Sequence, residues 1–221
     1  MHFELLVEDQ SGKKALDILM PKIIGNAHTF KVHPYKGIGR IPQNLQANAD
    51  ASKRILLDQL PRLLRGYGSA FASYPVDYPA AVIVVCDLDD RCLRLFRNEL
   101  FAVLSECDPT PDTRFCIAME EGEAWLLGDI PSIKAAYPGA KDIILNGYVN
   151  DSICDTWERL ADAVYPDGSA ALSAKGWQAI GTEKSAWAER ITRYMNVDEN
   201  ASPSFGYFRD KVRQLAEIES K

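Results

Sequence analysis

The seven residues AAVIVVC at positions 80–86 form the longest apolar run in the chain, and Asp87-Leu88-Asp89 follows at once. The run does not alternate between apolar and polar side chains, which is typical of a central parallel strand buried on both faces. Shorter runs at Phe3–Val7, Thr29–Val32 and Arg114–Met119 predict three further strands. Segments with helical apolar spacing separate these strands, so we expect an α/β fold with a parallel sheet.

The strand signal fades after Gly128, and the remaining apolar periodicity is helical. We therefore expect one domain, with an α/β sheet core at residues 1–128 and a mainly helical cap or extension at 129–221. Pro21 is expected to kink or shorten the first helix. The predicted helices are Lys14–Ile24, Ser52–Arg65, Asp90–Leu104, Glu123–Leu127, Ile130–Tyr137, Thr156–Val164, Lys184–Met195 and Ser204–Ile218.

The composition excludes several classes of protein. The chain has 221 residues, of which 47% are hydrophobic and 25% charged, as in soluble globular proteins and unlike disordered, fibrous or membrane proteins. No apolar stretch is long enough for a membrane span, and the N-terminus lacks a signal-peptide pattern, so we expect a cytoplasmic protein without membrane partners. The five cysteines form no CxxC pair, which indicates reduced thiols and not a zinc site.

Acidic residues stand at the end of three predicted strands. They are Glu8 after FELLV, Asp87 and Asp89 after VIVVC, and Glu120, Glu121 and Glu123 after RFCIAM. Because the carboxyl ends of parallel strands share one edge, we expect these groups to converge there. In an extended segment the two Asp side chains of the D-x-D would point the same way.

Clustered carboxylates repel one another and are normally held together by a cation. Their hard oxygen atoms select Mg²⁺, or Mn²⁺, over zinc. Taken singly, each acid has a structural explanation as well, because Asp89, Asp90 or Glu121 can cap the helix that follows. The recurrence at three strand ends favours the metal site.

These motifs resemble the Toprim fold, the metal-binding catalytic domain of topoisomerases, primases and overcoming-lysogenization-defect nucleases. An acid that closes the first strand and a D-x-D that closes a later one are its signature. The chain is also similar to a Toprim-like family of uncharacterised bacterial proteins often encoded beside AAA-type ATPases. The matching segments are VED at 7–9, CDLDD at 86–90, EGEAWLL at 121–127, Glu183-Lys184 with Trp187 and Ile191, and SPSF at 202–205.

The resemblance implies roles for particular residues. Asp87 and Asp89 would be Mg²⁺ ligands, and Glu8 would be a ligand or the general acid/base. Glu123 and Glu121 would complete the metal cluster, with Glu8, Asp87, Asp89 and Glu123 forming the catalytic set. The implied setting is bacterial defence against phage, together with an AAA-type ATPase partner.

A basic segment at Lys31–Arg65 carries seven Lys and Arg residues against two Asp, although the net charge of the whole chain is -6. Its loop YKGIGR at 35–40 combines two glycines with Lys36 and Arg40, which predicts contacts with phosphates. Lys184 is a further candidate for binding nucleic acid. The alternative is that these cations lie on an ordinary solvated surface. The four tryptophans are expected in the core beneath the helical cap.

The residues together predict a Mg²⁺-dependent phosphodiesterase, a nuclease that acts on DNA or RNA. Two other functions stay open at this point. One is a non-catalytic subunit that docks on an ATPase and regulates it. The other is a phosphotransfer enzyme or phosphatase acting on a small phosphorylated substrate.

Overall fold

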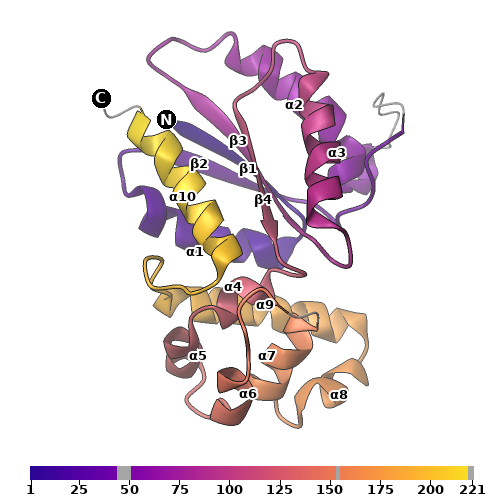
Figure 1. Ribbon diagram of the computed structural model, residues 1–221, viewed down its shortest axis with the longest axis vertical. Coiled ribbons are helices and arrows are strands. Elements are labelled where there is room, and N and C mark those ends of the chain that lie inside the picture. The colour runs from indigo at the N-terminus through magenta and orange to yellow at the C-terminus, as the bar shows by residue number, and fades with distance from the viewer. Residues whose placement is uncertain (44–50, 153–154, 219–221) are drawn as a thin grey trace.

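The computed structural model describes residues 1–43, 51–152 and 155–218 (Figure 1). These residues contain a four-stranded sheet in the order β2-β1-β3-β4, in which all three strand pairs are parallel. β3, which carries the apolar run, is a central strand whose residues 81–86 are all buried. The α/β class with a parallel sheet is thereby confirmed, and it is consistent with a Toprim-like fold. The strands are β1 (His2–Val7), β2 (Thr29–Pro34), β3 (Ala80–Asp87) and β4 (Thr113–Ala118).

Helices cover both faces of the sheet. α1 (Gln10–Ile24) and α10 (Pro203–Ile218) lie on one face, and α2 (Leu56–Phe71) and α3 (Leu93–Ser105) lie on the other (Figure 1). Each face of the sheet therefore has its own hydrophobic core. Successive residues of a strand point to opposite faces, so Ile83 of β3 packs in the core with α1 and α10, and its neighbours Val82 and Val84 pack in the core with α2 and α3. Because each face is covered, residues 81–86 of the apolar run are all buried, and the run does not alternate.

The first helix begins earlier than its apolar spacing predicted. Asp9 is the N-cap of α1, and its side chain accepts hydrogen bonds from the backbone N–H of Gly12 at 2.8 Å and from the hydroxyl of Ser11. Such a cap supplies a partner to the unpaired amides of the first helical turn. At the other end the helix continues past Pro21 and ends at Ile24, as its apolar spacing predicted, so Pro21 does not shorten it.

Beyond α4 (Glu123–Leu127), the described residues form only helices and loops. Figure 1 shows α5 to α9 gathered at the end of the sheet where α4 begins, while α10 returns to pack beside α1 and β4. The short helices α6 and α8 were not predicted. No helix of the described residues is long and apolar enough to cross a membrane. The bounds are α5 (Ile130–Ala136), α6 (Asp142–Asn146), α7 (Thr156–Val164), α8 (Gly168–Ser173), α9 (Trp177–Tyr194) and the 3-10 turn η1 (Ala51–Lys53).

Three of the four tryptophans are buried as expected: Trp125, Trp157 and Trp187. Trp177 is 83% exposed, so its assignment to the core is wrong. It is the first residue of α9, directly after a glycine in the left-handed region.

Gly68 of α2 marks a close approach between that helix and the loop before β4. A Cβ atom at Gly68 would lie 1.9 Å from the carbonyl oxygen of Pro109, so Gly68→Ala is expected to lower the free energy of unfolding by about 1–3 kcal/mol. Gly66 of the same helix has open space around it, and Gly66→Ala is expected to stabilise by about 0.5–1 kcal/mol. Urea denaturation of both variants tests this, and effects of the same sign would contradict it.

Candidate functional site

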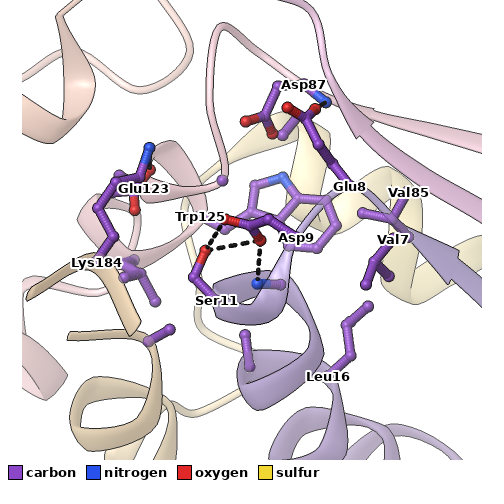
Figure 2. Close-up of a pocket in the computed structure, with 16 residues that line it drawn as sticks. Val7, Glu8, Asp9, Ser11, Leu16, Val85, Asp87, Glu123, Trp125 and Lys184 are labelled. Carbon is purple, nitrogen blue, oxygen red and sulfur yellow. Dashed lines mark hydrogen bonds and ion pairs between the residues drawn. The ribbon is translucent and has the colours of Figure 1, made fainter. Parts of the chain in front are cut away.

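The strand register places Glu8 and Asp87 side by side. Val7, the last residue of β1, pairs with Val85 of β3, so Glu8 leaves its strand next to the end of β3. One oxygen of the Glu8 carboxylate lies 3.5 Å from the backbone nitrogen of Asp87, and Figure 2 shows the two carboxylates adjacent at the same edge of the sheet. The predicted convergence therefore holds for these two acids, which are 79 residues apart in sequence.

Asp89 lies close by, but in a different geometry from the one expected. β3 ends at Asp87, and Asp89 has a φ of 52°, in the left-handed region. The alternation of an extended strand no longer applies there, so the reason for expecting the two Asp side chains of the D-x-D to point the same way is removed. The side chain of Asp89 is 43% exposed and lies 3.8 Å from the guanidinium of Arg91. Its backbone N–H donates to the carbonyl of Glu120 at 3.0 Å.

The electrostatics of these acids show that the nearby cations Lys184 and Arg91 compensate their charge only in part. Burial, followed by the charge of Asp89, raises the pKa of Glu8 to about 7. Burial, followed by the charge of Glu8, raises the pKa of Asp87 well above its ordinary value. Each carboxylate thus makes ionisation of its neighbour less favourable, which is the condition that a bound cation relieves.

Helix capping does not account for the acids at the ends of β3 and β4. The N-caps of α3 and α4 are Cys92 and Gly122, and neither makes a side-chain capping bond. Glu120 is different, because its carboxylate accepts hydrogen bonds from the backbone N–H groups of Asp155 and Thr156 at 2.6 and 2.8 Å. It thereby fixes the start of α7, a structural role that no local sequence pattern indicated.

Lys184 of α9 reaches into the same group of acids. Its ammonium lies 3.1 Å from a carboxylate oxygen of Glu121 and 3.1 Å from one of Glu123. Burial alone would lower the pKa of Lys184, but the charges of Glu123 and Glu121 outweigh it and hold that pKa above its ordinary value. Burial raises the pKa of Glu121 to about 7, although Lys184 opposes the shift. In this structure Lys184 contacts acids, whereas the sequence predicted that it contacts nucleic acid.

A cavity of about 60 Å³ lies between Glu8 and Asp87 on one side and Glu123 and Lys184 on the other (Figure 2). Its polar side chains are those of Glu8, Asp9, Ser11, Asp87, Glu123 and Lys184 (Figure 2). A buried water needs at least about 10–15 Å³ of such space, so the cavity has room for a few waters or a partly hydrated ion. A substrate larger than that would reach the carboxylates from the solvent side.

The loop at residues 35–40, here called the basic loop, lies directly against the edge of the sheet at which Glu8 and Asp87 stand, here called the acid edge. The backbone N–H of Gly37 donates to the carbonyl of Glu8 at 3.0 Å, and Lys36 and Arg40 are exposed on either side of it. Gly39 has a positive φ of 68°, and a Cβ atom there would lie 2.1 Å from the Ile55 side chain, so glycine is required at this turn. Residues 44–50 of the basic segment lie outside the described residues.

Arg91 joins the basic loop to the D-x-D segment, and the sequence did not single it out. Its guanidinium donates to the carbonyl of Gly39 at 3.3 Å, lies 3.8 Å from Asp89 and sits over the ring of Phe96 at 4.9 Å. The only signal in the sequence was a cation placed directly after three closely spaced acids.

The residues at this edge fit Mg²⁺ by donor chemistry, because Glu8 and Asp87 present adjacent carboxylate oxygens. Across the described parts of the chain, no three His, Cys, Asp or Glu side chains are already arranged to hold a metal ion. Proteins commonly bind Mg²⁺ through one or two carboxylates and leave its other positions to water and phosphate. A pair such as Glu8 and Asp87 meets that requirement.

Comparison with known proteins gives no independent assignment. No protein-family model, curated protein or solved structure matches the chain.

Proposed function

We propose that this protein is a Mg²⁺-dependent phosphodiesterase that cleaves nucleic acid. The observation that carries the proposal is the placement of Glu8 and Asp87 side by side, with the basic loop hydrogen-bonded to the backbone of Glu8. An enzyme that cleaves a phosphodiester needs both kinds of group at one edge. Oxygen ligands hold the metal ion, and exposed cations bind the flanking phosphates.

Each group has a distinct task in this proposal. Glu8 and Asp87 hold the ion, and Asp89 adds negative charge next to them. When bound, Mg²⁺ polarises a phosphate oxygen and activates the attacking water. Lys36 and Arg40 bind phosphates on either side of the one that reacts.

A long polyanion fits this arrangement better than a small phosphorylated substrate. The cavity of about 60 Å³ is too small to enclose a substrate of several atoms, and the cations of the basic loop lie outside it, on the surface. Membership of the Toprim-like family, the defence setting and the AAA-type ATPase partner are part of the same proposal and rest on the resemblance of the sequence motifs.

The test is cleavage of single- and double-stranded DNA and RNA with Mg²⁺ or Mn²⁺, by the protein alone and with a neighbouring ATPase. Glu8→Gln is the matched inactive variant. Metal-dependent cleavage that Glu8→Gln abolishes supports the proposal. Hydrolysis of small phosphate esters without cleavage of nucleic acid would replace it with a phosphatase, and no hydrolysis under any of these conditions would favour a non-catalytic ATPase subunit.

Lys36→Ala combined with Arg40→Ala is expected to weaken nucleic-acid binding equally across sequences. Each lost phosphate contact reduces the slope of log affinity against log salt by about one, so the double variant should flatten it by about two. Binding is measured in Ca²⁺ at several salt concentrations. Lys134→Ala combined with Lys141→Ala, in the helical part, removes the same charge elsewhere and should leave the slope unchanged. An equal slope in wild type and the Lys36/Arg40 variant would show that this loop is an ordinary solvated surface that does not contact phosphates.

A further inference from the structure

The ammonium of Lys184 contacts two carboxylates beside the proposed metal site. The resemblance assigned five carboxylates to the metal site, namely Glu8, Asp87, Asp89, Glu121 and Glu123. They form two groups. Glu121 and Glu123 share the ammonium of Lys184 at 3.1 Å each, whereas Glu8 and Asp87 form no ion pair with any described residue and Asp89 lies 3.8 Å from Arg91. The cavity lies between the groups, with Glu8 and Asp87 on one side and Glu123 and Lys184 on the other.

The Lys184 contacts are shielded from solvent, which makes them different from a surface ion pair. The side chains of Lys184, Glu121 and Glu123 are 16%, 21% and 4% exposed. Ion pairs on an open surface contribute little because water and salt screen them, whereas removal of one partner from a buried pair is strongly unfavourable. One oxygen of Glu121 is buried without a hydrogen-bond partner in the described structure, so without Lys184 this half of the cluster would contain further buried carboxylate oxygens that lack a partner.

We infer that Lys184 takes the place of a second metal ion, so that the protein binds one divalent ion, at Glu8 and Asp87, and not two. This inference rests on the proposed function. It assigns Glu121 and Glu123 to Lys184 and not to the metal, contrary to the roles that the sequence resemblance implies for them.

The experiment measures the number of Mn²⁺ ions bound, by calorimetry and by electron paramagnetic resonance of free Mn²⁺. Wild type is expected to bind one ion and Lys184→Met two, because Glu121 and Glu123 are then free to ligate. Lys184→Arg keeps the charge and should bind one. Lys14→Met is the control. Lys14 belongs to α1, and its ammonium lies 3.4 Å from Glu189, which is on α9 like Lys184 but outside the cavity. This variant should also bind one ion.

The outcomes separate this inference from the proposed function. If wild type binds no Mn²⁺, the proposed function fails and the inference fails with it. If wild type binds two ions, or folded Lys184→Met still binds one, the inference alone is overturned. Should Lys184→Met not fold, Glu121→Gln decides, because it should keep one ion at unchanged affinity. A loss of about tenfold or more in that variant would identify Glu121 as a ligand and overturn the inference.

Discussion

Asp87→Asn is expected to abolish Mn²⁺ binding and to reduce metal-dependent cleavage by about three orders of magnitude. A bound metal stabilises the transition state by several kcal/mol, and each 1.36 kcal/mol corresponds to about a factor of ten in rate. Asp87 is the acid at the centre of the cluster, where the charges of Glu8, Glu123 and Glu121 all raise its pKa after burial. Titration calorimetry with Mn²⁺ and a cleavage assay measure the two effects.

The same variant is expected to stabilise the metal-free protein at pH 8, because it removes repulsion among buried like charges. The folded-state pKa values of Asp87 and Glu8 are raised, so the folded wild type binds more protons than the unfolded chain, and its stability falls as pH rises from about 5 to 8. The advantage of Asp87→Asn should therefore shrink toward pH 5. A gain of about 1 kcal/mol would raise the melting temperature by roughly 2–4 °C.

Asp90→Asn is the matched control for Asp87→Asn, because Asp90 is exposed and lies three residues along the chain. It should change neither metal affinity nor stability. Unchanged Mn²⁺ affinity in Asp87→Asn would eliminate the metal site. A large loss of stability in Asp87→Asn would instead show that this carboxylate has a structural role beyond the contacts described above.

The sequence predicted those features that depend on short segments of chain. The four strands follow from local apolar runs, and the approach of Glu8 to Asp87 follows from the rule that parallel strands end at one edge. What it missed depends on contacts between distant segments. Lys184 meets Glu121 and Glu123 only because α9 packs on α1 and α4, and Glu120 caps α7 across 35 residues. Local periodicity contains no information about such contacts.

The left-handed turn at Asp89 depends both on local sequence and on a contact with a distant segment. A non-glycine residue with positive φ is uncommon, but Asp and Asn tolerate it better than most other residues. The D-x-D pattern alone could not show that β3 ends after its first Asp. The hydrogen bond from Asp89 N–H to the Glu120 carbonyl, which joins the segments that follow β3 and β4, accompanies the turn and is again a contact between distant segments.

Two sequence motifs that supported the family resemblance meet in the structure. The indole nitrogen of Trp125, in EAWLL, donates to the hydroxyl of Ser204, in SPSF, at 3.0 Å. The ring of Trp125 also stacks on Phe208 of α10, with ring centroids 5.0 Å apart. Asn200 adds a hydrogen bond from its side-chain amide to the Trp125 carbonyl at 2.7 Å. The two motifs therefore fasten α10 to α4, the helix that begins with Glu123.

Trp125→Ala is accordingly expected to lower the free energy of unfolding by about 3–5 kcal/mol, as is usual when a buried aromatic ring is removed from a core. Trp125→Phe keeps much of the packing and loses only the bond to Ser204, so it should cost about 1 kcal/mol beyond any change in packing. Trp177→Ala, at a tryptophan that is 83% exposed, is the control of the same residue type and should change stability little. Chemical denaturation of the three variants measures these differences.

Trp125→Ala also tests which elements hold the metal ion, because Trp125 lines the cavity and belongs to the same short helix as Glu123 (Figure 2). Loosening α4 moves Glu123 relative to Lys184, while Glu8 and Asp87 stay fixed by their strands. Mn²⁺ should therefore still bind to the folded Trp125→Ala protein, although less of it is folded. Mn²⁺ binding lost while Trp125→Ala remains folded would show that α4, and not only the ends of β1 and β3, holds the metal ion.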